Sequence, residues 1–469
     1  QGAVAGDVYG NGTTEVVTVG YFHNTTTDVD TGEAKIWSWN GTELVTEYAE
    51  NSTLIYPTRF SSVALGNVDN ETDNEVVIAG MTLVSFIYFH PPDPPVVFTQ
   101  MQGLLMVGSW NGSALEHKSM TYWPNDRAVE TNVFGVAVAD VDKDNTTEII
   151  TVGYENKTGF YGTGKHGQLA IWSLNVTTME LVLETSQEWL VSGDVEWHGI
   201  AVADVNNDGI LEMVVTGDFL DTTLGHQCAM LRIGTWNGTD FEWKATNQWF
   251  TYSDTFASAV TTGDLDSDGV PEIVTSGTQK SSETNNAQLR IWSFKDNILT
   301  LKASVEDGVL ELFGRAAGKA VAIADVDNNG KNEIIYAVDK GIFFSSTSSI
   351  RILSWDGGSV GEKDSQSWSN ATNVQGVLAS DVDEDEKMEV ISIGYYSPFY
   401  ILPPPPPIKG EVGVWSVAKN ASAIELDLSS QNIVIGNQVT ISGKLSNEDG
   451  STPIPHSEVT VESTPELGT

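Results

Sequence analysis

The chain has 469 residues, 40% of them apolar, which is enough for one large domain and a small second one. Its 64 acidic residues outnumber 23 basic ones and give a formal charge of −41, which argues against nucleic acid and anionic membrane surfaces as partners. The single cysteine, Cys228, excludes an internal disulfide, and no stretch reaches the ~18–20 apolar residues of a membrane-spanning helix.

One pattern recurs about every 60 residues: an alternating apolar run, an acidic loop that ends in a glutamate, and a second apolar run. Its seven copies begin at Gly2, Ser62, Gly135, Gly199, Ser258, Ala320 and Gly376. Alternation with a period of two predicts strands, and the intervening loop predicts that each pair is antiparallel.

Each copy continues with a strand-like run that carries a tryptophan signature, such as AKIWSWNGT at 34–42. Asn-Gly or Asp-Gly follows in four copies and favours a tight hairpin turn. A fourth alternating run completes the unit. Repeated units of four short strands are typical of propeller blades, so the sequence predicts an all-β fold with a seven-bladed β-propeller of four-stranded antiparallel blades over residues 1–430.

The acidic loops follow the pattern D-x-D-x-D-G-x-x-E in their best copies. Calcium takes six to eight oxygen ligands, which alternate residues of a tight turn can supply while the glycine permits the bend. The glutamate at position nine begins the next strand, unlike the one at position twelve of an EF-hand. We therefore expect about five to seven calcium ions, although the first two loops depart most from the pattern and fit an ordinary acidic hairpin turn equally well. The predicted ligands are, loop by loop, Asp7, Asn11 and Glu15; Asn67, Asp69, Glu71 and Glu75; Asp140, Asp142, Asp144 and Glu148; Asp204, Asn206, Asp208 and Glu212; Asp264, Asp266, Asp268 and Glu272; Asp325, Asp327, Asn329 and Glu333; Asp381, Asp383, Asp385 and Glu389.

These loops and their place in the repeat resemble the FG-GAP repeats of integrin α-subunit propellers and of related prokaryotic (VCBS-like) proteins, over about residues 1–430. FGVAVAD at 134–140 comes closest to the family's tags. The resemblance implies calcium between the first and second strands of a blade, and partner binding on the opposite face. The chain lacks the disulfides of animal integrins. Its resemblance therefore favours a bacterial or archaeal surface protein, in which calcium provides the stabilisation that disulfides provide elsewhere.

Two loops between second and third strands are rich in proline and aromatic residues, at 88–98 and 395–408. Proline runs are stiff, and adjacent aromatic side chains offer an apolar platform. Partner binding and covering of the propeller mouth are both compatible with them. The predicted partner-binding residues are Tyr88, Phe89, Trp197, Tyr395, Tyr396, Phe399 and Tyr400.

Twelve N-x-S/T sequons occur, and glycosylation of an exported protein is best placed at Asn24, Asn51, Asn156 and Asn370. Turn formation is the alternative reason for Asn-Gly-Thr. Asp194, Glu196, Trp197 and His198 cluster in one loop, with His166 and His226 expected on the same face, so a carboxylate-plus-histidine site for polysaccharide cleavage is conceivable. Their spacing matches no known catalytic motif, and we do not expect an enzyme.

The run AIELDLSS at 423–430 lies where a seventh blade would place its fourth strand, whereas residues 431–469 resemble the start of a bacterial immunoglobulin-like domain. Such a sandwich needs roughly 100 residues, so we expect either a longer natural chain or completion by strand addition from another copy, which would build a filament.

The sequence thus predicts an extracellular or cell-surface, calcium-stabilised propeller that serves adhesion or assembly. Its expected partners are other surface proteins, copies of itself or glycans. A carbohydrate-binding propeller and a polysaccharide-degrading enzyme are the alternatives.

Overall fold

The computed structural model describes residues 2–52, 54, 56–69, 71–88, 96–124, 129–157, 163–191, 193–250, 253–280, 285–308, 314–342, 345–369, 372–396, 409–416, 423–428 and 441–446. The chain divides into two compact units, residues 1–415 and residues 416–469. All regular secondary structure in the described residues is β-strand. Within them we find no helix with the length and apolar character needed to cross a membrane.

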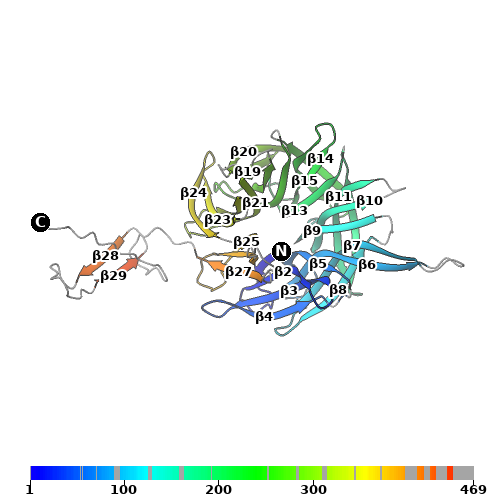
Figure 1. The fold of residues 1–469 in the computed structure, drawn as a ribbon, viewed down its shortest axis with the longest axis horizontal. Coiled ribbons are helices and arrows are strands. Elements are labelled where there is room, and N and C mark those ends of the chain that lie inside the picture. Colours follow the sequence, from blue (N-terminus) through cyan, green and yellow to red (C-terminus); the bar gives the residue numbers. More distant parts are fainter. Residues whose placement is uncertain are drawn as a thin grey trace. The chain divides into compact units, whose positions relative to one another are not determined.

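The first unit consists of small antiparallel sheets whose strands follow the order of the chain (Figure 1). The first four sheets have four strands each. They comprise β1 (Gly2–Gly6), β2 (Glu15–Asn24), β3 (Val29–Trp39) and β4 (Leu44–Asn51); β5 (Thr58–Gly66), β6 (Glu75–Tyr88), β7 (Val96–Trp110) and β8 (Leu115–Trp123); β9 (Val129–Ala139), β10 (Glu148–Lys157), β11 (Gly164–Asn175) and β12 (Glu180–Trp189); β13 (Val195–Ala203), β14 (Glu212–Asp221), β15 (His226–Trp236) and β16 (Phe241–Trp249).

The remaining strands of this unit form one eight-stranded and one three-stranded sheet. They are β17 (Thr255–Gly263), β18 (Glu272–Lys280), β19 (Asn285–Lys295), β20 (Ile298–Gly308), β21 (Gly314–Ala324), β22 (Glu333–Ile342), β23 (Ser345–Trp355) and β24 (Val360–Ser369), and then β25 (Thr372–Ser380), β26 (Glu389–Tyr396) and β27 (Lys409–Trp415). The eight-stranded sheet has two four-stranded halves, β17–β20 and β21–β24, which meet through one parallel bridge between Asn285 and Arg315.

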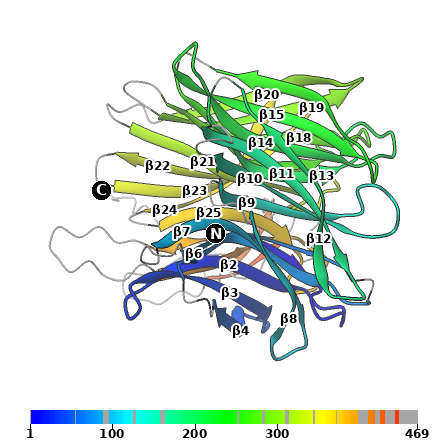
Figure 2. The same cartoon turned by 90° about the vertical axis from the view of Figure 1, so that its right-hand side faces the viewer.

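The sheets are arranged around a common centre, as Figure 1 shows. The first strands of successive sheets or sheet halves contact one another in the order β1, β5, β9, β13, β17, β21 and β25, and β25 contacts β1. In the side view of Figure 2, β21, β22 and β23 lie side by side, as their pairing requires. The prediction of an all-β propeller built of small antiparallel sheets is confirmed. Seven separate four-stranded sheets are not found, because two of them join and β25–β27 has no fourth strand among the described residues.

The core lies between neighbouring sheets. Val77 and Leu105 of the second sheet pack in one cluster with Val136, Ile149 and Trp172 of the third sheet. Second strands are therefore buried on both faces, as the near-continuous apolar run of β14 illustrates, whereas an outer strand such as β12 alternates between exposed and half-buried residues. Burial on two faces explains why the second run of each repeat is the more apolar one.

A glycine ends the second apolar run in most copies of the repeat because two backbones meet there. An added Cβ at Gly277 would lie 2.0 Å from the carbonyl oxygen of Phe256, and at Gly153 it would lie 1.9 Å from that of Asn132. The pairing register shifts at Gly153, so the first strand bulges toward the glycine. Equivalent approaches occur at Gly80, Gly217 and Gly394.

In the second unit, β28 (Ala423–Leu428) pairs antiparallel with β29 (Ile441–Ser446). The sequence placed residues 423–430 as the last strand of the propeller and the domain boundary after residue 430. In the structure this run instead pairs with a later segment, and the compact propeller unit ends at Trp415. Most of residues 431–469, the segment likened to an immunoglobulin-like domain, lies outside the described residues.

Candidate metal-binding loops

The glutamate that closes each acidic loop accepts a hydrogen bond from the residue just after the loop's first ligand position. The N–H of Leu265, for example, donates to Oε2 of Glu272 at 2.9 Å. The same bond joins Val8 to Glu15, Val68 to Glu75, Val141 to Glu148, Val205 to Glu212, Val326 to Glu333 and Val382 to Glu389, at 2.9–3.1 Å. These glutamates begin the second strands and are buried. Each acidic loop is thus closed by a carboxylate held in the core.

The aspartate at position one organises the turn with both carboxylate oxygens. Oδ1 of Asp264 accepts the N–H of Asp268 at 3.2 Å, and Oδ2 accepts the N–H of Gly269 at 2.9 Å. The same pair of bonds occurs at Asp7, Asp140, Asp204, Asp325 and Asp381. This aspartate therefore shapes the loop even before any ion is considered.

In six of the loops, position six lies in the left-handed region of the backbone, as the glycine in the pattern predicts. Gly269 has a φ of 86°, and Gly12, Gly209 and Gly330 have similar values. Asn145 and Glu386 occupy the position in the third and seventh loops with φ values of 71° and 67°. Asparagine tolerates this conformation better than glutamate does, so Glu386 is the strained member of the set.

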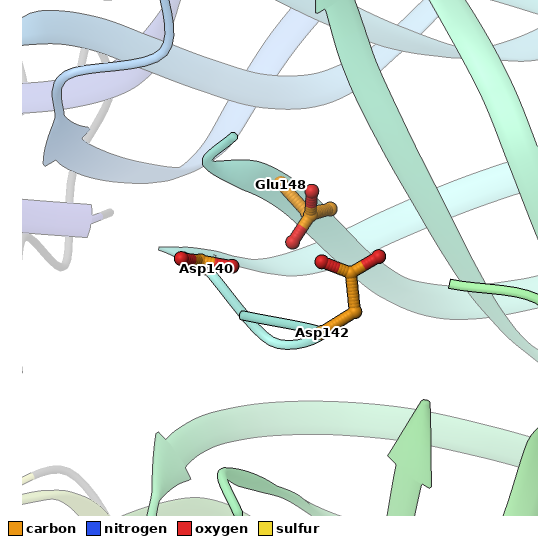
Figure 3. A group of neighbouring side chains, drawn as sticks. All are labelled: Asp140, Asp142 and Glu148. Atoms are coloured by element: carbon orange, nitrogen blue, oxygen red, sulfur yellow. The ribbon is translucent and has the colours of Figure 1, made fainter. Parts of the chain in front are cut away.

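Carboxylates converge in four of the loops. Asp140, Asp142 and Glu148 direct oxygens toward one another from the loop and the start of β10 (Figure 3), and these oxygens lie within 4.8 Å of one another. The equivalent groups are Asp264, Asp266 and Glu272; Asp325, Asp327 and Glu333; and Asp381, Asp383 and Asp385. Convergent carboxylates suit a hard divalent cation, so these clusters could hold a metal ion.

The closing glutamates sit in an environment that disfavours their charge. Burial, together with the neighbouring loop aspartates, raises the pKa of Glu148, Glu212, Glu272 and Glu389 to about 7 against the lowering effect of the backbone N–H. A cation between the carboxylates would favour the ionised form instead. The electrostatics and the geometry of the loops therefore point to the same kind of ligand.

The other three loops show no such group of converging carboxylate oxygens among the described residues. In the first loop, the hydroxyl of Thr13 donates to Oδ1 of Asn11 at 2.6 Å and to Oε1 of Glu15 at 2.8 Å. In the fourth loop, the amide of Asn206 donates to Glu212 at 2.9 Å. In the second loop, Asn67 donates to the carbonyl oxygen of Glu71 and does not accept the two backbone N–H groups found elsewhere.

Neighbouring loops are connected by residues that the pattern did not single out. The side-chain amide of Asn74 donates to the carbonyl oxygen of Asp7 at 2.9 Å, and that of Asn332 donates to the carbonyl oxygen of Asp264 at 2.8 Å. Both asparagines occupy position eight of the following loop. The shared position of the two asparagines was the one sequence feature that could have indicated this hydrogen bond between loops. The two loops come together only because neighbouring sheets pack side by side in the ring.

The structure buries one predicted partner-binding residue, half-buries another and leaves the side chains of the rest undescribed. Trp197 is fully buried in the core between the third and fourth sheets, so its placement on a partner-binding surface is wrong: its strand, β13, lies next to the ring's centre. Tyr395 is half-buried in β26. Tyr88 and Tyr396 are described as strand ends only, and Phe89, Phe399 and Tyr400 lie outside the described residues.

Of the predicted glycosylation sites, Asn51 is exposed at the end of β4. The side chain of Asn24 accepts the N–H of Thr26 at 3.0 Å, as in an Asx turn, and Asn156 lies half-buried in β10. Asn370 lies outside the described residues.

The histidines considered for catalysis are paired with other carboxylates, and the carboxylates of the candidate site contact Lys165. His198 lies 2.8 Å from Asp218, and Glu196 lies 2.6 Å from Nζ of Lys165. Oδ1 of Asp194 accepts the N–H of Lys165 at 2.9 Å. His166 pairs with Glu188 and His226 with Asp254. His226 and His166 belong to different sheets, and these contacts do not assemble the three histidines into one site.

No protein-family model and no curated protein matches the sequence. Among solved structures, the rhamnogalacturonan lyase YesW is similar at 13% identity and a TM-score of 0.35, over 85% of this chain and 76% of the lyase. The Nup133 β-propeller domain of Vanderwaltozyma polyspora is similar at 8% identity and a TM-score of 0.37, over 70% of this chain and 96% of that domain. An exo-inulinase from Aspergillus awamori is similar at 11% identity and a TM-score of 0.32, over 79% and 93% of the two chains. Likeness this distant assigns neither an activity nor a substrate to this chain.

Proposed function

We propose that this protein is an extracellular propeller that calcium stabilises and that serves adhesion or assembly at the cell surface, as a binding or structural module without catalytic activity. The observation that carries the proposal is the closing glutamate: in all seven copies it is buried and bonded to the loop backbone. Four copies add converging carboxylates. Buried carboxylates gathered without a counter-charge repel one another, and a cation would stabilise them.

Calcium is the cation we propose because the donors are hard oxygens, and the recurring tight turn offers several of them on one side. The proposal includes seven blades of the FG-GAP type. It is supported by the seven first strands that contact one another in order and by the contact of β25 with β1. The third, fifth and seventh loops are the proposed strongest sites, since their carboxylates converge and no described ion pair joins them to a lysine of another strand. Lys387, which pairs with Asp385, belongs to the seventh loop itself.

An extracellular location follows from the same proposal, since weak calcium sites fill where the free ion is abundant. The proposed partners are other surface proteins, copies of this chain or glycans. The acidic surface, at −41 overall, supports partners with neutral or basic surfaces.

Calcium titration of chelator-treated protein, followed by native mass spectrometry and calorimetric melting, tests the metal part of the proposal. We expect bound ions and a melting temperature that rises by several degrees with calcium, because a ligand that binds only the folded state stabilises it. Asp264→Ala should remove one ion. A melting temperature that chelator and calcium leave equal would contradict the proposal. Negative-stain microscopy with and without calcium tests assembly: ordered polymers support it, and monodisperse single rings count against it.

Glycan binding is the second candidate, and one cluster favours it. The ring of Phe134 lies 5.8 Å from that of Tyr154 and 5.4 Å from that of His198, and Nζ of Lys165 lies 4.5 Å from the Tyr154 ring. Aromatic and charged side chains in one place suit sugars. A glycan array with the protein and its Tyr154→Ala variant tests this candidate, and equal signals from the two proteins would count against it.

A further inference from the structure

Six fourth strands contain a charged residue at the same β-bulge. In β8, His117 pairs with Gly108 and Ser119 pairs with Val107, so Lys118 has no partner across the ladder. The register skips one residue at the equivalent place in the other five strands. The residues at the bulge are Glu47, Lys118, Glu184, Lys244, Lys302 and Lys363. A bulge redirects its side chain, and at Lys118 and Lys363 the side chain reaches the acidic loop of the same sheet.

Lys118 extends into the second acidic loop. Its Nζ contacts Asp69, lies 3.1 Å from Oε1 of Glu75 and lies 3.7 Å from Glu71. The side chains of Asp69 and Glu75 are fully buried, and that of Lys118 is 17% exposed. All three predicted carboxylate ligands of this loop therefore surround one ammonium group.

The second loop differs from the others in ways that fit an ammonium ion. Position one is Asn67, which donates a hydrogen bond where the aspartates of the other loops accept two. Although burial acts to lower the pKa of Lys118, its hydrogen bonds to Asp69 and Glu75 raise that pKa above its ordinary value. A lysine ammonium is a compact charge with three donors, and three carboxylates match those donors.

In the sixth loop a lysine from the fourth strand also pairs with loop carboxylates. Nζ of Lys363 lies 2.6 Å from Asp327 and 2.6 Å from Glu333. This loop retains Asp325 with its two backbone bonds. By contrast, Lys302 at the bulge of β20 is exposed, and no described ion pair joins it to the fifth loop.

We infer that Lys118 is a built-in counter-ion that takes the place of a divalent cation in the second loop, so that this blade is stabilised without metal. Lys363 competes with a cation for the sixth loop in the same way. The inference rests on the proposed calcium function for the meaning of the other loops. It predicts that the blades differ in how far their stability depends on calcium. The second blade should be independent of the ion, and the third, fifth and seventh should depend on it.

The test compares Lys118→Gln with the matched control Lys302→Gln, which changes the same residue type at the same bulge. In chelator, we expect the melting temperature to fall by several degrees for Lys118→Gln and to stay within about one degree for Lys302→Gln, because a buried charge that loses its partner is strongly destabilising. In calcium, Lys118→Gln should recover part of this loss. Native mass spectrometry should then find one more calcium ion per chain than in the parent protein.

A double variant keeps the test decisive if Lys118→Gln alone folds poorly. Asp69→Asn in the Lys118→Gln background should melt above Lys118→Gln alone in chelator, because it removes a carboxylate that has lost its counter-charge. Strictly additive effects, or a Lys118→Gln protein that matches Lys302→Gln in chelator, would overturn the inference. Both measurements are made without calcium, so they decide the role of Lys118 even if the parent protein binds no ion and the proposed calcium function fails.

Discussion

The backbone N–H of Leu265 donates a 2.9 Å hydrogen bond to Oε2 of Glu272, so the start of the fifth acidic loop is fastened to its end. The carboxylate has two oxygens: Oε2 holds the loop backbone, and the group also lies within the cluster of Asp264 and Asp266. One side chain therefore serves the fold and the candidate metal site together, and its two roles can be separated by mutation.

Glu272→Gln and Glu272→Ala should have opposite effects in chelator at pH 8. Glutamine keeps an acceptor for the N–H of Leu265 and removes a buried charge, so we expect a gain on the order of 1 kcal/mol in the free energy of unfolding. Alanine leaves that N–H without its partner, and we expect a loss of about 1–3 kcal/mol. Both variants should gain less from calcium than the parent. Urea unfolding in chelator and in calcium measures these differences, and two variants of equal stability would contradict the dual role.

The stability of the chelated protein should fall as the pH rises from about 5 to about 7. The pKa of Glu148, Glu212, Glu272 and Glu389 is about 7 in the folded loops, against an ordinary value of 4.5. In this window the folded state binds more protons than the unfolded state, so raising the pH favours unfolding. Calcium stabilises the ionised form, and its effect on the melting temperature should be larger at pH 7.5 than at pH 5.5. Melting curves at both pH values check this, and a calcium effect that does not change with pH would speak against it.

Gly277→Ala should be among the most destabilising single-methyl additions in the protein. Its Cβ would lie 2.0 Å from the carbonyl oxygen of Phe256, and both atoms belong to paired strands that cannot easily separate. We expect a loss of at least about 3 kcal/mol. Gly225→Ala is the control, since Gly225 has a φ of 72° but open space around it, and should cost about 1 kcal/mol. Urea denaturation of the two variants would refute the steric explanation if their losses were equal.

Glu386→Gly should stabilise the seventh loop. Glu386 has a φ of 67°, a conformation that costs a residue with a Cβ roughly 1 kcal/mol and glycine little. We expect a gain of about 0.5–1 kcal/mol in the free energy of unfolding, together with unchanged calcium stoichiometry because the side chain is exposed. Gly330→Ala makes the reverse change at the same position of the sixth loop and should lose about 1 kcal/mol. A Glu386→Gly protein that is less stable than its parent would refute the strain argument.

The structure confirms several sequence predictions because they depend on local rules. Alternation placed the paired strands, and the left-handed φ of Gly269 follows from the tight turn that the pattern predicted. Other predictions depended on long-range packing and failed. Trp197 was placed in an exposed loop with Asp194, Glu196 and His198, but it belongs to β13, and its side chain is buried completely between the third and fourth sheets.

The sequence by itself determined the repeat, the all-β character and the loops in which a glutamate closes an acidic turn, because strand alternation and turn chemistry act over a few residues. The tertiary structure alone decided which charge meets each loop. Lys118 lies 43 residues after Glu75, and a bulge in the fourth strand brings its ammonium group to that carboxylate. The equivalent bulge in β20 leaves Lys302 exposed. The sequence does not show directly that Lys118 reaches its loop while Lys302 stays exposed. That difference depends on where the fourth strand and the acidic loop of each sheet place their side chains in space.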